Sequence, residues 1–375
     1  MKKAMRVLHI NCNYVGTTLH QLMTEALDAL GYSNQVFVPT YDRKTAVIVP
    51  NENVCFCECF NKWDRLVFDY KQKKIRAALQ ANINASNFDL IHAYTLFTDG
   101  NCARRLSRAY GIPYVVAVRN TDVNSFFRLM PHLRHRGVQI MRDAAAVFFL
   151  SEAYRKQVFD KYIPEQYRKE IEKKTHIIPN GIDSFWFDNQ PEVKKGFDPR
   201  KIKLVYAGRI DRNKNIPSTQ KAVKLLRKQG YEVTLTVVGK VLDKKSFRII
   251  QKDPYTTYYP AMPKEKLIDI YRESDIFVMP SFTESFGLVY AEAMSQGLPV
   301  VYSKGQGFDN QFAEGLVGYH VDANNPSDIA DGIRRVIAHY DDIQKNVVRA
   351  ARGFNWTRLA EEYDQIYRAI HVGRM

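Results

Sequence analysis

Short apolar runs rich in Val, Ile, Phe and Tyr alternate with helix-like segments along the chain, and this alternation restricts the fold more than any other feature. The first half contains RVLHI, QVFV, DLIHA, YVVAV and AVFFL, and the second half contains KLVYAG, VTLTVVG, DIFVMP and LPVVYS. Such alternation is typical of βαβ units, whose parallel strands are covered by helices on both faces. The sequence therefore predicts an α/β fold.

A segment of different character separates the two halves. From Ile178 it reads IIPNGIDSFWFDNQPEVKKGFDPRK, with frequent Pro, Gly, Asn and Asp and no clear period, as in a linker. We expect an N-terminal domain over residues 1–182 and a C-terminal domain over residues 183–355. Open parallel sheets bind ligands beyond the carboxyl ends of their strands, so we expect the site in a cleft between two such domains.

The composition is that of an ordinary globular protein, with 45% hydrophobic and 25% charged residues. No apolar run approaches the ~18 residues that span a bilayer, and the start MKKAMRVLHI lacks a long apolar leader. The five cysteines show no spacing typical of a disulfide framework, which favours a reducing compartment. We therefore expect a soluble, cytoplasmic protein.

Three of the cysteines, Cys55, Cys57 and Cys59, lie in the sequence CFCECF. On an extended strand they share one face and could resemble a thiolate metal site. No fourth ligand follows at zinc-site spacing, and cysteines often pack as small hydrophobes. We expect apolar packing and no metal.

The net charge of +15 is concentrated in the first half. Residues 1–182 carry 26 Lys and Arg against 16 Asp and Glu, which leaves +10 on that half. This asymmetry indicates an anionic partner: nucleic acid, anionic lipid headgroups or a phosphorylated substrate.

The first βα turn, NCNYVGTT at residues 11–18, contains only Gly16. A dinucleotide fingerprint needs three glycines at GxGxxG spacing, so this turn argues against NAD or FAD. A phosphate-binding loop of the GxxxxGK[ST] type is also missing from the sequence.

The most informative segment of the second half is PSFTESFGLVYAEAMSQGLPVV, from Pro280 to Val301. We expect a strand, a turn and then a helix from about Phe286 to Ser295. Glu284 precedes this helix and Glu292 lies in its second turn, so two carboxylates accompany the free amides of a helix N-terminus. They could accept from the hydroxyls of a ribose or hexose. In the alternative interpretation, Ser285 caps the helix and the glutamates are ordinary charged positions.

A second segment, KLVYAGRIDRNKN, places Arg209 and Lys214 directly after a strand and Gly208. Two cations in one loop suit a diphosphate, because Arg binds bidentately and Lys acts as a point charge. The alternative is a charged surface loop.

Four ordered motifs together resemble the family 4 (group 1) retaining glycosyltransferases, strongly over residues 175–370. They are GRxxxxK at Gly208–Lys214, the Glu-x7-Glu frame of ESFGLVYAE, PNGID at Pro179–Asp183, and the closing aromatic helix WTRLAEEYDQIY. The resemblance implies a GT-B fold of two Rossmann-like domains facing a cleft. It also implies that the closing helix, within residues 356–375, crosses back and completes the N-terminal, acceptor-side domain.

The resemblance also implies a function for the second half. The donor would be a UDP- or GDP-sugar, with Arg209 and Lys214 on the diphosphate and Glu292 on the ribose. Glu284 would hold hydroxyls of the transferred sugar. The backbone of four further residues would contact this sugar and its phosphate: Ser285, Phe286, Gly287 and Leu288. The nucleotide-sugar is a substrate, so the resemblance implies neither cofactor nor metal.

The first half departs from the family pattern. Members often have a Gly-rich first loop, whereas this chain has only Gly16 there. Gly16 is therefore our candidate for the position where the backbone approaches the donor phosphate or the acceptor closely. Members often carry a His where this chain has Arg119, and Asp122 matches the acid that follows. A guanidinium cannot act as a base, so Arg119 would stabilise charge or bind the acceptor. His92, near a strand end, is a further acceptor-side candidate.

Two basic stretches suggest where the acceptor binds. The first stretch, KWDRLVFDYKQKKIR from Lys62 to Arg76, fits a basic amphipathic helix that lies on a membrane. It fits equally well a helix whose apolar stripe packs against the protein core. RLMPHLRHRG, from Arg128 to Gly137, follows Arg119. Both favour a glycan or lipid-linked acceptor in cell-surface polysaccharide synthesis, with peripheral contact to the inner membrane face.

Two other classes of function compete with this interpretation. A nucleic-acid-binding protein would explain the charge, but the sequence shows no zinc finger, RNP-like strand or recognition helix, so we expect no nucleic acid. A non-catalytic sugar-nucleotide-binding protein or partner subunit would keep Arg209, Lys214 and Glu292, and Arg119 in place of His is compatible with it.

Overall fold

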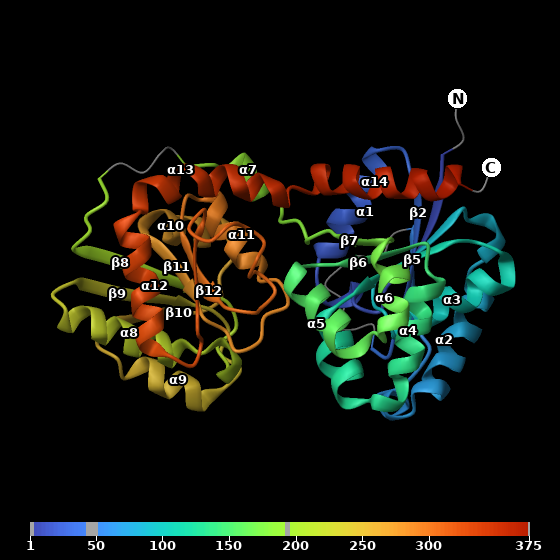
Figure 1. Cartoon of the computed structure of the whole chain (residues 1–375), viewed down its shortest axis with the longest axis horizontal. Helices are drawn as coiled ribbons and strands as arrows, with labels where there is room; N and C mark the ends of the chain where they lie inside the picture. Colours follow the sequence, from blue (N-terminus) through green and yellow to red (C-terminus); the bar gives the residue numbers. More distant parts are fainter. Residues whose placement is uncertain (1–3, 43–51, 192–195, 374–375) are drawn as a thin grey trace. The chain divides into compact units, whose positions relative to one another are not determined.

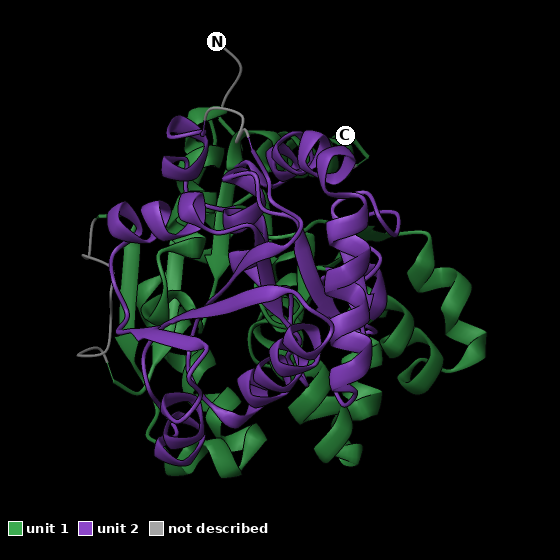
Figure 2. Ribbon diagram, turned by 90° about the vertical axis from the view of Figure 1, so that its left-hand side faces the viewer, with its two compact units in different colours: residues 1–150, 154–181, 356–375 green, residues 151–153, 182–355 purple. Residues whose placement is uncertain are grey.

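The computed structural model describes residues 4–42, 52–191 and 196–373, which form two compact units (Figures 1 and 2). Unit 1 comprises Met1–Leu150, Tyr154–Gly181 and Trp356–Met375, and unit 2 comprises Ser151–Ala153 and Ile182–Asn355. Each unit is built on one parallel sheet, so the predicted α/β class with two Rossmann-like domains is confirmed.

The sheet of unit 1 has seven strands in the order β3-β2-β1-β4-β5-β6-β7, all paired in parallel. Their bounds are β1 Arg6–Ile10, β2 Ser33–Thr40, β3 Val54–Glu58, β4 Leu90–Ala93, β5 Tyr114–Val118, β6 Ala146–Phe149 and β7 Thr175–Ile177. The helices are α1 Leu19–Ala29, α2 Phe68–Asn82, α3 Thr98–Tyr110, α4 Arg134–Asp143, α5 Glu152–Tyr162, α6 Glu165–Glu172 and α14 Trp356–Val372.

Two hydrophobic clusters cover opposite faces of this sheet. Leu8 and Ile10 of β1 belong to one cluster, which includes Ile75 of α2, while Val7 between them belongs to the other, which includes Tyr363 of α14. Alternate residues of a strand point to opposite faces, so the sheet is covered on both sides and its strands are continuously apolar. The cysteines of CFCECF are half-buried and pack against the first cluster as small hydrophobes, as predicted.

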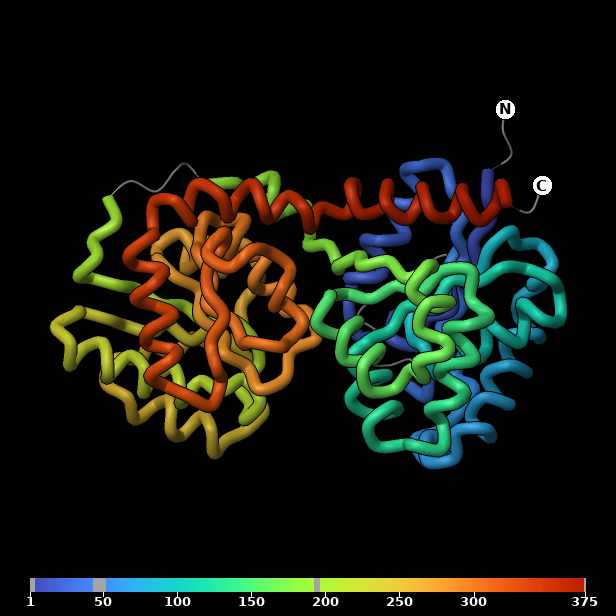
Figure 3. The backbone as a smooth tube through the Cα atoms, in the orientation of Figure 1, coloured from blue at the N-terminus to red at the C-terminus, as the bar shows by residue number. Residues whose placement is uncertain are grey.

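The closing helix α14 belongs to unit 1, where it packs against α1 (Figure 3). Asp364 accepts a 2.6 Å hydrogen bond from the Tyr32 hydroxyl. The Tyr367 hydroxyl lies 2.5 Å from Nδ1 of His92, and both side chains are fully buried. The helix is therefore fixed to β4 and to the turn between α1 and β2 by polar contacts inside an aromatic core.

The sheet of unit 2 has six parallel strands in the order β10-β9-β8-β11-β12-β13. Their bounds are β8 Lys201–Ala207, β9 Glu232–Val238, β10 Thr256–Tyr259, β11 Ile276–Met279, β12 Val300–Ser303 and β13 Gly318–Val321. The helices are α7 Phe185–Asp188, α8 Ile216–Lys228, α9 Lys244–Gln251, α10 Lys264–Glu273, α11 Leu288–Ser295, α12 Pro326–Ala338 and α13 Tyr340–Ala351. Every residue of β11 and β12 is buried, as expected for central strands covered on both faces.

The PNGID turn needs its glycine for packing. A Cβ atom on Gly181 would lie 2.6 Å from the indole of Trp356, the first residue of α14. One residue later the chain enters unit 2, where Ile182 donates a 2.9 Å backbone hydrogen bond to Phe354. None of the described helices is both long and apolar enough to cross a bilayer.

The contact between His92 and Tyr367 predicts a loss of stability in Tyr367→Phe. The substitution leaves Nδ1 of His92 without its partner in a fully buried site, which costs about 1–3 kcal/mol. We expect the thermal unfolding midpoint to fall by several degrees. Tyr259→Phe, at a tyrosine that is 43% exposed, is the matched control and should leave the midpoint unchanged. Equal midpoints for both variants would contradict the role assigned to this contact.

Candidate functional site

Three loops meet at the carboxyl edge of the unit 2 sheet, after β8, β11 and β12. The side chain of Asn213, in the first loop, donates to the carbonyl of Thr283 in the second at 2.8 Å and accepts from its amide at 3.0 Å. The amide of Gly307, in the third loop, donates to the carbonyl of Glu284 at 2.9 Å. A Cβ atom at Gly307 would lie 1.8 Å from the Ser285 carbonyl oxygen, so only glycine permits this approach.

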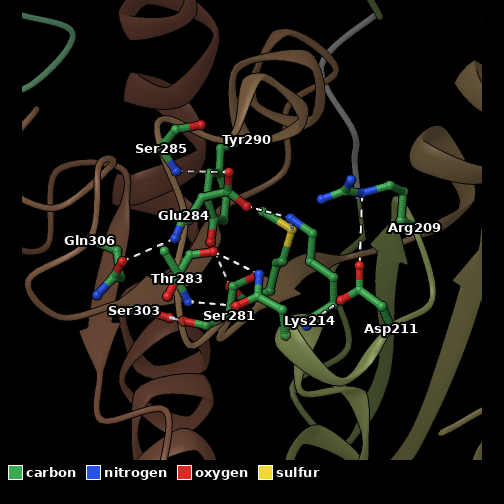
Figure 4. Close-up of polar contacts among 12 residues, drawn as sticks. Arg209, Asp211, Lys214, Ser281, Thr283, Glu284, Ser285, Tyr290, Ser303 and Gln306 are labelled. Atoms are coloured by element: carbon green, nitrogen blue, oxygen red, sulfur yellow. Dashed lines mark hydrogen bonds and ion pairs between the residues drawn. The ribbon is translucent and has the colours of Figure 1, made fainter. Parts of the chain in front are cut away.

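The structure brings Lys214 and Glu284 together at this edge (Figure 4). The ammonium of Lys214 pairs directly with Oε2 of Glu284, and both side chains are only 11% exposed. The other carboxylate oxygen, Oε1, accepts from the Ser285 amide at 3.1 Å. The Glu284 amide in turn donates to the Gln306 side chain at 3.0 Å. Charge-assisted contacts of this kind hold both groups in one orientation before a ligand arrives.

Arg209 lies in the same loop as Lys214 but in a different environment. Its side chain is 65% exposed, and Nε lies 3.8 Å from Oδ2 of Asp211 (Figure 4). Its backbone is held, because the Tyr206 hydroxyl donates to the Arg209 carbonyl at 2.5 Å. The loop therefore presents two exposed guanidinium groups, Arg209 directly after Gly208 and Arg212 three residues later, and one buried ammonium, that of Lys214.

Helix α11 begins at Leu288, two residues later than predicted. Its N-cap is Gly287, whose φ of +78° is the left-handed conformation that favours glycine, so Ser285 does not cap the helix. A Cβ atom at Gly287 would also lie 2.6 Å from the Tyr290 ring. The Phe286 side chain is buried against Phe308 and Phe354, so this residue faces a ligand only through its backbone.

Glu292 lies in the second turn of α11, as predicted, and is half-buried. Burial, and secondarily the charge of Asp183, raise its pKa to about 7, while Lys264 acts in the opposite direction. Lys264 forms an ion pair with Asp183, so Glu292 belongs to a second charged group of the same domain. The PNGID segment thus contributes a carboxylate to the surroundings of Glu292, which the sequence did not indicate.

In unit 1, Arg119 and Asp122 lie together at the carboxyl end of β5. Arg119 is only 8% exposed, and it donates to the Asn180 side chain at 2.8 Å and to the Tyr94 carbonyl at 3.2 Å. Asp122 accepts from three backbone amides, those of Leu96, Phe97 and Arg119, at 2.8–3.1 Å. Burial raises the pKa of Asp122 to about 6. The pair therefore joins the loops after β4 and β5.

The two remaining candidates of unit 1 are placed differently from each other. Gly16 ends a short turn after β1, its φ is not positive, and a side chain there would meet no atom within 4 Å. Neither conformation nor packing therefore requires a glycine at this position. His92 is fully buried under α14, stacked on Tyr94 with ring centroids 4.3 Å apart. The structure places it in the core and not at the open edge of the sheet.

Two polar residues at the same edge were missed from the sequence. His20, in the first turn of α1, is 5% exposed, and Asn11 at the end of β1 is fully buried. Nδ1 of His20 and Nδ2 of Asn11 have no hydrogen-bond partner among the described residues. Burial, followed by the charge of Arg119, holds the pKa of His20 well below its usual range. A lone His in an amphipathic helix gives no signal of such a position.

Across residues 4–42, 52–191 and 196–373, no three or more His, Cys, Asp or Glu side chains are grouped so that they could hold a metal ion. The charged side chains of the loops at the edge of unit 2 include Arg209, Asp211, Lys214 and Glu284.

Two family models match consecutive parts of the sequence. The model described as Glycosyltransferase Family 4 matches residues 15–184, and the model described as Glycosyl transferases group 1 matches residues 188–354. The chain belongs to the family 4, group 1 glycosyltransferases. Both models match in the order in which the two domains occur, so the family resemblance extends into the first half, where the motifs are weaker.

Curated relatives of this glycosyltransferase carry one recurrent name. A D-inositol 3-phosphate glycosyltransferase of Paenarthrobacter aurescens is 29% identical over 310 residues, which are 76% of this chain and 74% of that protein. The protein of that name from Arthrobacter sp. strain FB24 is 26% identical over 368 residues, 90% of this chain and 86% of its own.

Solved structures share the fold. The sucrose-phosphate synthase of Thermosynechococcus elongatus superposes with a TM-score of 0.74 at 19% identity, over 98% of this chain and all of that one. Anabaena Alr3699/HepE, in complex with UDP and glucose, superposes with a TM-score of 0.68 at 16% identity, over 97% of this chain and all of that one. These are GT-B structures, so the predicted fold class is confirmed.

The raised pKa of Glu292 predicts an unusual pH dependence of stability. The folded protein keeps this carboxyl protonated up to about pH 7, whereas an unperturbed Glu ionises near 4.5, so stability falls as the pH rises between these values. Glu292→Gln keeps the shape without the charge. In the absence of ligand we expect it to be more stable than wild type at pH 8, by about 1–3 kcal/mol, and equally stable below pH 4.5.

Denaturant titration at both pH values measures this difference. Glu265→Gln, at an exposed position in the first turn of α10, is the control and should change stability little at either pH. A Glu292→Gln variant that is less stable than wild type at pH 8 would show that the carboxylate is stabilised in the folded state, contrary to this prediction.

Proposed function

We infer that this glycosyltransferase moves a hexose-type sugar from a UDP- or GDP-sugar to an acceptor hydroxyl, with retained configuration at the anomeric carbon. The observation that carries the proposal is the buried pair of Lys214 and Glu284 beside the exposed guanidinium of Arg209. A nucleoside-diphosphate-sugar combines an anionic diphosphate with neutral hydroxyls. A cationic loop next to a fixed carboxylate complements both parts.

The proposed roles follow the chemistry of each side chain. Arg209 binds the diphosphate, because its exposed guanidinium lies directly after β8 and Gly208, and Lys214 adds a second positive charge. Glu284 accepts hydrogen bonds from hydroxyls of the transferred sugar while its Oε1 keeps the Ser285 amide. Glu292 accepts from the ribose hydroxyls.

The N-terminus of α11 supports the same donor. Gly287 in its left-handed conformation ends the loop, and Leu288 begins the helix, so the first amides of α11 point out of its N-terminal end. These amides and the helix dipole favour a phosphate or a developing anion. We assign the backbone of residues 285–288 to the sugar and its phosphate.

The transfer step balances without a redox partner. The bond between the anomeric carbon and the diphosphate oxygen breaks, and its electron pair leaves with the diphosphate. The acceptor oxygen bonds to the anomeric carbon on the same face, and its proton passes to the departing phosphate. Arg209, Lys214 and the α11 amides would stabilise the charge that develops on the leaving group. We propose that these groups make the reaction independent of metal ions and of cofactors.

We assign the acceptor to the first domain, over residues 1–182 completed by 356–375, and the donor to residues 183–355. The open space beside Gly16 and the buried guanidinium of Arg119 lie at ligand-binding edges of the unit 1 sheet. Arg119 remains positively charged, so its proposed role is to bind an anionic acceptor group through its position and not to remove a proton. Asp122 holds the backbone on which Arg119 lies.

The proposed acceptor carries a phosphate. Its support is the net charge of +10 on residues 1–182 and the name of the curated relatives, which are D-inositol 3-phosphate glycosyltransferases. A lipid-linked glycan diphosphate in cell-surface polysaccharide synthesis has the same chemistry. The two acceptors are distinguished by the product formed from each. A non-catalytic sugar-nucleotide-binding protein, the alternative, would yield no product from either.

The donor site predicts a specific loss of nucleotide binding in Arg209→Ala. Charge-assisted hydrogen bonds are worth about 1.5–3 kcal/mol, so the dissociation constant for UDP or GDP should rise about 10- to 100-fold. Isothermal titration in the presence of EDTA measures both the effect and the metal independence. Arg212→Ala, an exposed arginine of the same loop, is the matched control and should bind as wild type does.

Activity is tested with the nucleotide-sugars of whichever base binds. The anomeric coupling constant in the NMR spectrum of the product distinguishes retention from inversion. Binding that requires a divalent cation, or that is lost equally in Arg209→Ala and Arg212→Ala, would overturn the proposed donor site. Tight binding with no transfer to inositol phosphate or to lipid-linked glycan would favour the non-catalytic alternative.

A further inference from the structure

Four large apolar side chains at the start of α2 face solvent. Trp63 and Leu66 are each 78% exposed, Val67 is 58% exposed and Tyr70 is 51% exposed. They come from a short 3-10 helix, Trp63–Leu66, and from the residues that follow it. These four residues, the α2 patch, therefore do not form the core-facing stripe that the sequence also allowed. Clustered exposed apolar residues on a folded protein usually mark an interaction surface.

The α2 patch is surrounded by positive charge. Residues 60–80 contain six Lys or Arg and only two acids, Asp64 and Asp69. Lys74 pairs with Asp64 at 2.7 Å, and Arg136 of α4 pairs with Asp69. Both acids are thus neutralised by ion pairs, and the surroundings of the patch are cationic.

An arginine-lined pocket of about 690 Å³ lies between α2, α3 and α4. Among the described residues, no Asp or Glu lines this pocket. Its lining includes five arginines: Arg76, Arg104, Arg105, Arg108 and Arg136. Arg104 and Arg108 both pair with Asp143 at 2.7 Å. No ion pair is found for Arg76 or Arg105 within the described part of the chain, so this arginine pocket has uncompensated charge suited to a phosphate.

The pocket and the α2 patch are parts of one surface of unit 1. Helix α2 contributes Tyr70 to the patch and Arg76 to the pocket, less than two helical turns apart. Arg136 lines the pocket, pairs with Asp69 next to Tyr70, and lies with its guanidinium 5.2 Å from the centre of the Phe68 ring. The ion pair of Arg136 with Asp69 therefore connects the arginine pocket to the first turn of α2, which carries Tyr70 of the patch.

We propose that this surface docks the protein on an anionic phospholipid bilayer, with the phosphate of a lipid headgroup in the arginine pocket. Trp and Tyr favour the headgroup level of a bilayer, and exposed aliphatic side chains enter the boundary with the acyl chains. A soluble phosphate would use the pocket but not Leu66 and Val67. A nucleic acid would use the charge without needing exposed aliphatic groups. The combination of both features favours a membrane surface, and this function is separate from the donor site in unit 2.

Trp63 provides a direct measurement of docking. The chain has three tryptophans, and the other two, Trp186 and Trp356, are 2% and 7% exposed. The emission of Trp63 should shift to shorter wavelength when vesicles of phosphatidylglycerol and phosphatidylcholine are added, and high salt should reverse the shift. Vesicles of phosphatidylcholine alone should give no shift. Trp63→Phe should lose the shift but still sediment with the anionic vesicles.

Two pairs of substitutions separate the arginine pocket from general charge. Each cation near an anionic bilayer contributes about fivefold in affinity, so Arg76→Ala with Arg105→Ala should weaken binding about 30-fold. Lys244→Ala with Lys245→Ala removes the same charge from α9 of unit 2 and should leave binding unchanged. Leu66→Glu should also weaken binding. None of these variants should alter the thermal stabilisation by nucleotide, which keeps this test independent of the donor site.

Three outcomes would overturn the proposal. Absence of sedimentation with anionic vesicles would exclude docking. An equal loss of vesicle binding in the Arg76→Ala, Arg105→Ala variant and in the Lys244→Ala, Lys245→Ala variant would show that positive charge acts without a defined site. Displacement of the protein from vesicles by low concentrations of glycerol phosphate, with no effect of Leu66→Glu, would identify the pocket as a site for a soluble phosphate.

Discussion

All strands of both sheets run parallel, and this constraint determines where chemistry is placed in the molecule. A parallel strand returns to its starting edge through a crossover, so every carboxyl end opens on one edge and every loop there is fixed by two regular elements. In unit 2 the loops after β8, β11 and β12 meet in this way, which brings Lys214 to Glu284 although 70 residues separate them in the sequence. In unit 1 the same arrangement places Arg119 beside Asn180.

The parts of the site that were predicted from sequence are those that depend on residues close together in the chain. Gly208 and Gly287 both adopt positive φ. Gly208 directly precedes Arg209, and Gly287 follows Glu284 by three residues in the loop after β11. Spacing therefore indicated that Arg209, Lys214, Glu284 and Glu292 share one sheet edge. It did not indicate that Lys214 and Glu284 form an ion pair with each other, because that contact depends on the packing of two loops. The sequence also did not predict that Asp183 lies near Glu292, because this contact depends on the path of the linker.

Other features are set by tertiary packing alone. Strands β7, β10 and β13 have three or four residues each, are half-exposed in part and include His or Thr, so periodicity does not distinguish them from loops. His92 resembled a ligand at a strand end, but α14 covers it from the far end of the chain. For the segment from Lys62 to Arg76, the same apolar residues fitted either a buried stripe or an exposed surface. Only the structure shows that Trp63 and Leu66, in the 3-10 helix before α2, face solvent.

Unit 1 is discontinuous, and this has a consequence for folding during synthesis. Unit 2 consists almost entirely of one continuous stretch, whereas unit 1 needs Trp356–Val372 to cover Tyr94, Val115 and Phe148. Domains generally fold in the order in which the ribosome delivers them. Here the first domain to be synthesised cannot complete its core until the second has left the ribosome. An unfinished chain therefore exposes an aromatic face of the nascent first domain, and chaperones that bind apolar surfaces would meet it throughout translation of the second.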